Sequence, residues 1–160
     1  MRSSGFRLMS AATILASLIV TALAAHAATP FSRLHGTWSG AGQLRLENGK
    51  TESIRCSASY VPRASELGLS LRCASASNRV ELRATLTSRG DRVSGSWEER
   101  SYNASGRVSG MAVGDTLRLQ IEGGGLAGTM LVRTTGGSQS ISVRTDTTAL
   151  KGVNISLRRN

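Results

Sequence analysis

The chain has 160 residues, with 20 Lys and Arg against 10 Asp and Glu, so its formal net charge is +10. Aromatic residues make up only 4% of it, and a nucleic-acid surface needs stacking aromatic side chains between its basic ones. We therefore expect no nucleic-acid partner. The basic residues are spread singly along the sequence, which indicates a solvated surface that favours anionic partners through long-range attraction.

The first 27 residues have the pattern of a secretory signal peptide. Arg2 and Arg7 precede an apolar run over residues 11–25, and an Ala-His-Ala sequence ends at position 27. An uncleaved anchor is the alternative, but a run of 15 residues is short for a membrane span. No cysteine stands directly after the apolar run, which excludes a lipoprotein anchor.

Cleavage after position 27 leaves one domain, residues 28–160, with a net charge of +8 after the loss of two arginines from +10. We predict a periplasmic or secreted protein with no transmembrane segment once the signal is removed.

The first predicted strand spans about residues 37–47. Its apolar face carries Trp38, Gly40, Gly42, Leu44 and Leu46. The Asn48-Gly49 pair that follows is typical of a two-residue hairpin turn. Such a turn would pair Leu46 with Thr51 and leave Ile54 out of phase. We expect a bulge between Thr51 and Ser53 to restore the register, with a longer loop as the alternative.

The two cysteines of the chain lie on the next two predicted strands. Folding these strands about residues 63–66 places Cys56 opposite Cys73, Ala58 opposite Leu71 and Tyr60 opposite Leu69. Directly opposite positions of an antiparallel pair meet disulfide geometry. An oxidising compartment then favours a disulfide over the alternative, two buried free thiols.

The rest of the chain repeats short alternating strands separated by turn residues. In each strand every second residue belongs to the apolar face. These faces lie within residues 80–86, 93–97, 108–112, 117–121, 126–132, 141–143 and 153–157. The opposite faces are rich in Ser, Arg and Gln. About eight to ten such strands predict an all-β fold, an antiparallel up-and-down meander closed into a small barrel. Gly95, Gly110 and Gly128 at inward positions suit sharp strand curvature or close approach across a small barrel.

Gly36-Thr37-Trp38 at the start of the first strand resembles the G-x-W that begins lipocalins and, more loosely, other calycin barrels. The resemblance implies that Trp38 closes one barrel end and packs against an arginine from the last strand, which here is Arg159. The match covers three residues and one arginine, and the strand count departs from the eight of lipocalins. The chain is also similar to uncharacterised small exported bacterial β-barrel proteins in its G-T-W-S-G start, paired cysteines and S-G-S-W-E-E segment.

The sequence offers no catalytic or metal-binding constellation. His35 stands alone in the lead-in, and a tetrahedral metal site needs several such ligands. Glu98 and Glu99 are adjacent, so on a strand they point to opposite faces and do not share a cleft. We expect Glu99 to point toward a barrel mouth, where it would orient a ligand. No cofactor is indicated.

The leading hypothesis is therefore a non-enzymatic binding barrel for a small apolar ligand or an anionic envelope polymer. Its candidate barrel-end or ligand-lining residues are Trp38, Tyr60, Trp97, Glu99 and Arg159. The alternative is a protein-binding module, such as an inhibitor of a hydrolase that attacks the envelope.

Overall fold

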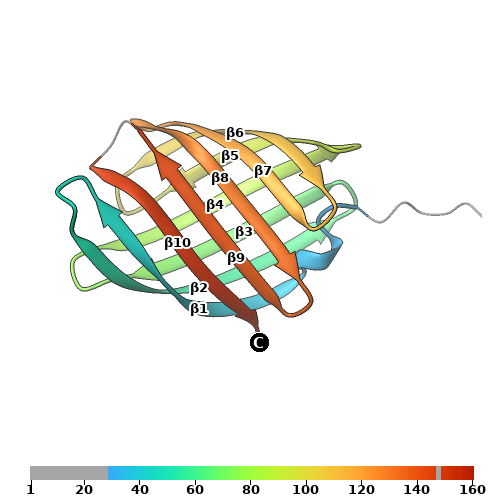
Figure 1. The fold of residues 1–160 in the computed structure, drawn as a ribbon. Helices are drawn as coiled ribbons and strands as arrows, with labels where there is room; N and C mark the ends of the chain where they lie inside the picture. Colours follow the sequence, from blue (N-terminus) through green and yellow to red (C-terminus); the bar gives the residue numbers. More distant parts are fainter. Residues whose placement is uncertain (1–28, 147–148) are drawn as a thin grey trace, which may run out of the picture.

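The protein is a barrel of ten antiparallel strands (Figure 1). The computed structural model describes residues 29–146 and 149–160, so the predicted signal peptide lies outside the described residues. One 3-10 turn, η1 (Ser32–Leu34), precedes the strands. The strands are β1 (Gly36–Leu46), β2 (Thr51–Arg63), β3 (Glu66–Ala74), β4 (Arg79–Arg89), β5 (Arg92–Glu99), β6 (Ala104–Val113), β7 (Thr116–Gly123), β8 (Leu126–Thr135), β9 (Ser138–Thr145) and β10 (Leu150–Arg159).

Every strand pairs with its neighbours in the sequence, and the last strand pairs with the first. The order around the barrel is β1-β10-β9-β8-β7-β6-β5-β4-β3-β2. In the pair that closes the barrel, Trp38 lies opposite Arg159 and Gly42 opposite Ile155. The predicted up-and-down meander is confirmed. Closure leaves no sheet edge with unpaired backbone groups.

The alternation of the sequence separates a dry interior from a wet exterior. Along β2, Ile54, Cys56, Ala58 and Tyr60 are all buried, while Ser53, Arg55 and Ser57 are exposed. The inward residues form one core cluster. Gly95 belongs to this inward set, and a Cβ placed on it would lie 2.1 Å from the Thr85 carbonyl oxygen. The atoms nearest to this position all belong to the neighbouring strand β4, so the backbone at Gly95 lies close to the adjacent strand.

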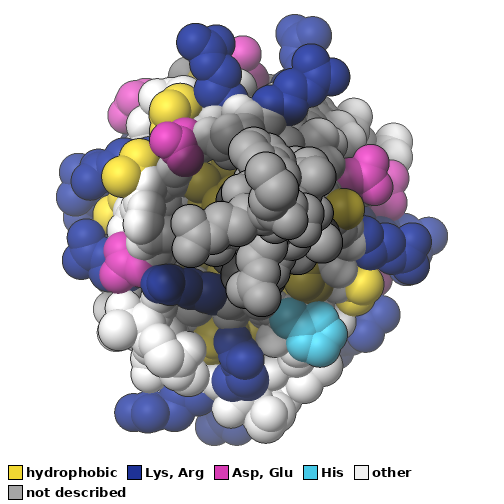
Figure 2. All heavy atoms as spheres, turned by 90° about the vertical axis from the view of Figure 1, so that its right-hand side faces the viewer, with side chains coloured by type: hydrophobic (Ala, Val, Ile, Leu, Met, Phe, Trp, Pro, Cys, Tyr) yellow, Lys and Arg dark blue, Asp and Glu magenta, His cyan; other side chains and the backbone are white. Residues whose placement is uncertain are grey.

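The two ends of the barrel differ. One end carries η1 together with the β2–β3, β4–β5, β6–β7 and β8–β9 turns, and we call it the η1 end (Figure 1). Figure 2 looks onto this end and shows Lys and Arg side chains spaced around its rim. The opposite end, which we call the far end, carries the β1–β2, β3–β4, β5–β6 and β7–β8 turns.

The disulfide between Cys56 and Cys73 is confirmed, and so is its register. Cys56 pairs with Cys73, Ala58 with Leu71 and Tyr60 with Leu69. The bridge joins neighbouring strands across a sequence separation of 17 residues. It fixes the pairing of β2 with β3 on the inner face of the barrel.

The predicted bulge between Thr51 and Ser53 is wrong. The pairing of β1 with β2 runs without a break from Arg45 opposite Thr51 to Gly36 opposite Tyr60. The register is set by a longer loop instead, closed by a hydrogen bond from the Leu46 N–H to the Lys50 carbonyl oxygen. Gly49 takes a φ of 79°, so the odd residue is absorbed at the left-handed glycine of the turn.

Removing the disulfide tests how far it holds the second hairpin together. The double substitution Cys56→Ala and Cys73→Ala should lower the free energy of unfolding by about 3 kcal/mol, because the unfolded chain regains the entropy of a loop of this length. Urea unfolding measures the loss, and wild type reduced with dithiothreitol should show a similar one. An unchanged unfolding midpoint in both would contradict the structural role.

Candidate functional site

The η1 end is closed by apolar side chains and by a hydrogen bond from β1. Phe31 and Trp38 are fully buried, and Leu34 is 3% exposed. The Trp38 indole Nε1–H donates to the Leu34 carbonyl oxygen at 2.9 Å. The Trp38 ring is therefore buried and its one polar atom has a hydrogen-bond partner. This hydrogen bond connects η1 to the barrel wall.

Trp38 also contacts the last strand, as the calycin resemblance implied. The Arg159 guanidinium carbon lies 4.7 Å from the centre of the Trp38 ring. The guanidinium donates as well to the carbonyl oxygen of Arg33, the middle residue of η1. Tyr60 meets Trp38 edge to face, with ring centres 6.4 Å apart. Three of the five predicted residues thus share one end, while their role in ligand binding stays a prediction.

A buried polar chain, which the sequence analysis missed, continues from Tyr60. Its hydroxyl donates to Gln139 Oε1 at 2.7 Å, and Gln139 Nε2 donates to Thr134 Oγ1 at 3.2 Å. Burial raises the pKa of the Tyr60 phenol well above its usual value, so the ring stays neutral. The signal for this chain was present, because Gln139 and Thr134 occupy inward positions beside Ile141 and Val132.

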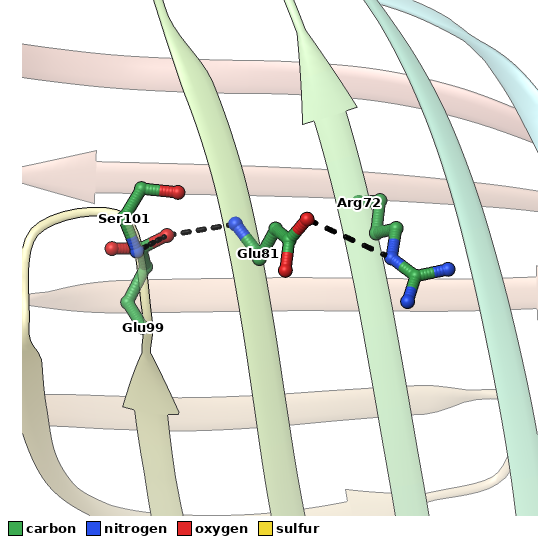
Figure 3. A network of polar contacts seen from close by, with 4 residues as sticks. All are labelled: Arg72, Glu81, Glu99 and Ser101. Carbon is green, nitrogen blue, oxygen red and sulfur yellow. Dashed lines mark hydrogen bonds and ion pairs between the residues drawn. The ribbon is translucent and has the colours of Figure 1, made fainter.

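Glu99 lies at the far end, where β5 leads into the loop to β6. Its carboxylate accepts hydrogen bonds from the backbone N–H groups of Glu81 at 2.7 Å, Ser101 at 3.1 Å and Tyr102 at 2.7 Å. Figure 3 shows two of these residues, with Glu81 also facing Arg72 at 4.0 Å on the outer wall. The carboxylate thus orders this loop, and a ligand-orienting role remains a prediction.

The same hydrogen bonds determine the charge of Glu99. Burial alone raises the pKa of its carboxyl, but the backbone N–H groups of Glu81, Tyr102 and Ser101 outweigh that effect and hold the pKa below its usual value. Glu99 therefore stays ionised at neutral pH.

Trp97 differs from Trp38 in one respect that matters for binding. Its side chain is 7% exposed, and its indole Nε1 is buried with no hydrogen-bond partner among the described residues. The ring packs against β6, since a Cβ placed on Gly106 would lie 2.8 Å from Trp97 Cε2. Trp97 lies two residues before the end of β5, in the half of the barrel toward the far end.

The inner wall at the far end is apolar but not fully covered. Several inward-facing side chains there are only partly buried, while Leu44, Ile54 and Ile121 in the same half are buried. Toward the η1 end most inward side chains are almost fully buried, with Leu69 as an exception. The partly buried set is Leu69, Leu71, Cys73, Leu82, Ala104, Leu126, Met130, Val143, Leu150 and Val153. Some apolar side chains in the half of the barrel that holds Trp97 are therefore within reach of solvent, and this part of the inner wall is the candidate binding site.

Across residues 29–146 and 149–160, no three His, Cys, Asp or Glu side chains gather where they could hold a metal ion. His35 is exposed and follows η1 directly. In the described part of the chain, no helix has both the length and the apolar character to cross a membrane.

Comparison with known proteins supports the fold and no more specific identity. No family model and no curated protein matches the sequence. Rv2717c from M. tuberculosis is similar in structure, with a TM-score of 0.69 and 15% identity over 83% of this chain and 98% of that one. The S-type phycobiliprotein lyase CPES from Guillardia theta has a TM-score of 0.60 and 13% identity over 81% of this chain and 90% of that one. Both are small ten-stranded barrels of the calycin-like type, so the predicted resemblance holds at the level of fold.

Neighbouring arginines of β10 provide a test of the closed end. Arg159→Ala should lower the free energy of unfolding by about 1 kcal/mol, because it removes the cation–π contact with Trp38. Arg158→Ala is the control, since Arg158 points outward and is exposed. Thermal unfolding compares the two, and equal losses would show that the contact with Trp38 contributes nothing.

The adjacent glutamates offer a matched pair for Glu99. At pH 7, Glu99→Gln should cost about 1 to 2 kcal/mol, because an amide offers one oxygen where the carboxylate accepts from three N–H groups. Glu98→Gln, at an exposed position, should cost much less.

The loss in Glu99→Gln should also depend on pH. A lowered folded-state pKa contributes stability that is fully present above the unfolded-state pKa and disappears as the pH falls through the folded-state pKa. The difference between wild type and Glu99→Gln in urea unfolding should therefore narrow below about pH 4. A difference that is the same at pH 7 and pH 3 would contradict this assignment.

Proposed function

We propose that the protein is a non-enzymatic binding barrel that takes a small, mostly apolar molecule through its far end. The ligand carries one hydrogen-bond acceptor, which accepts a hydrogen bond from the Trp97 indole N–H. The partly exposed apolar wall supplies the binding area for the rest of the molecule. The observation that carries the proposal is the unpaired, buried Nε1 of Trp97.

The physical argument rests on the contrast between the two tryptophans. A buried donor without a partner costs about 1 to 3 kcal/mol relative to a paired one. Trp38 avoids this cost by donating to Leu34 within the chain. Trp97 does not avoid it within the described residues. A carbonyl or ether oxygen of a bound molecule would supply the missing acceptor, and the surrounding side chains favour an otherwise apolar ligand.

The state of the interior titratable groups supports binding rather than catalysis. The Tyr60 phenol is held neutral in its chain with Gln139 and Thr134. The Glu99 carboxylate is engaged by three backbone N–H groups. A general acid or base needs a proton that it can exchange with a substrate, and these two groups are committed to the fold.

The similar structures and the disulfide are compatible with this proposal. The Guillardia theta neighbour is named a phycobiliprotein lyase. Its name indicates that a barrel of similar fold acts on another molecule. The Cys56–Cys73 bridge fits a periplasmic or secreted location, where disulfides persist.

A fluorescent ketone tests the role of Trp97. Prodan is a neutral naphthalene with one carbonyl group, and N-phenyl-1-naphthylamine is a similar apolar probe without one. Trp97→Phe keeps an aromatic ring and removes the N–H, so it should weaken Prodan binding about tenfold while leaving N-phenyl-1-naphthylamine binding little changed. Trp38→Phe, at the closed end, is the control and should leave both affinities unchanged.

Native mass spectrometry of protein purified from its own host tests the proposal itself. The expected result is a bound small molecule that is lost on unfolding. Repeated absence of any bound molecule, together with no uptake of either probe by the wild type, would overturn the interior site.

A further inference from the structure

We infer that the outer wall of the barrel holds a second site, which binds an oxyanion carried by a hydroxylated small molecule. The site is a groove of about 340 Å³ across β1, β10 and β9. It is separate from the interior site, since most of its lining belongs to the outward-facing set. The lining comprises Gln43, Leu44, Arg45, Thr51, Ser142, Val143, Arg144, Gly152 and Asn154.

Two arginines flank a glycine at the centre of this groove. Gly152 pairs with Arg45 on one side and with Arg144 on the other. The two arginines thus lie two strand spacings apart, about 10 Å between their Cα atoms, and long side chains from both sides can reach one anion between them. The Arg45 guanidinium already extends over the glycine, with Nη2 at 3.7 Å from where a Cβ would stand.

Within residues 29–146 and 149–160, neither arginine forms an ion pair with an acidic side chain. The remaining cross-strand neighbours, Thr51 beside Arg45 and Thr129 beside Arg144, are uncharged. No acidic residue lines the groove. The ion pairs of the described residues lie elsewhere, between Arg72 and Glu81 and between Lys151 and Glu47. Two positive charges that share one groove repel each other, and a bound oxyanion would relieve that repulsion.

The other lining groups indicate what carries the anion. Gln43 and Asn154 pair across β1 and β10, and Asn154 pairs with Ser142 on β9. These amides and this hydroxyl form a row beside the arginine row, and they donate and accept hydrogen bonds. The two rows fit a sugar phosphate or a sugar acid, with the oxyanion on the arginines and the sugar hydroxyls on the polar row.

Binding of three small sugars to the full-length, disulfide-bonded protein tests the site. Glucose 6-phosphate and glucuronic acid carry the two anions, and glucose is the neutral control. Isothermal titration and backbone amide NMR shifts should detect one or both anions, with the shifted amides on β1, β9 and β10 and no binding of glucose. A preference for the phosphate or for the carboxylate identifies the natural source. Affinity should fall as salt is added.

Substitution of the arginines decides whether the groove is responsible. Arg45→Ala and Arg144→Ala should each weaken anion binding about tenfold or more. Arg118→Ala is the matched control and should bind as the wild type does, because Arg118 is exposed on β7 and also lies between uncharged neighbours, Met111 and Leu131.

Three results would overturn the inference: no binding of either anion, equal binding of glucose, or anion binding that survives both arginine substitutions. Circular dichroism and the melting temperature show whether each variant is folded. Because Arg45→Lys keeps the charge and the length of the side chain, it provides a second variant that should lose only part of the affinity. Uptake of Prodan should stay unchanged in all of these variants, which separates a failure here from a failure of the interior site.

Discussion

The pairing of the first strand with the last is the constraint on which the rest of the structure depends. It places Trp38 opposite Arg159, and the contact between their side chains exists only when the barrel is closed. Arg159 of the last strand also donates to the Arg33 carbonyl oxygen in η1, so closure and the covering of the η1 end are coupled. The same pairing brings Arg45 beside Gly152 and completes the outer groove. A meander with the same strands left open would lack all three features and would expose two sheet edges.

The same alternating sequence pattern ends differently at the two ends of the closed barrel. At the η1 end, the inward side chains are covered and their polar atoms are paired, as in the chain from Tyr60 through Gln139 to Thr134. At the far end, Glu99 is used to order a loop, and the apolar wall near Trp97 remains partly exposed. The two ends therefore differ in how fully their inward side chains are covered. The outer wall adds a charged groove without altering the interior, because successive residues of a strand face opposite sides.

The alternation of apolar and polar residues along the sequence was enough to predict most of the strands and their pairing. The register of Cys56 with Cys73 followed from the requirement that all apolar residues share one face. The contact of Trp38 with Arg159 followed from the calycin resemblance and from Arg159 lying two residues after the inward-facing Leu157. The prediction for the loop over residues 47–50 was wrong because a left-handed glycine absorbs an odd residue as readily as a bulge does. The Glu99 contacts depend on one N–H group of β4 and two of the following loop, whose positions no local pattern reveals. The pairing of Arg45 and Arg144 with Gly152 requires the register of three strands from opposite ends of the chain.

The central claim is that the interior is accessible from the far end and covered at the η1 end. Methyl NMR with the soluble radical TEMPOL measures this directly, because the radical speeds the relaxation of any methyl group that it can approach. The structure predicts strong effects on the methyls of Leu71, Leu82, Met130 and Val153 and weak effects on those of Leu67, Leu86 and Leu157. Equal protection of both sets would contradict an accessible interior, and equal exposure would contradict the covered end.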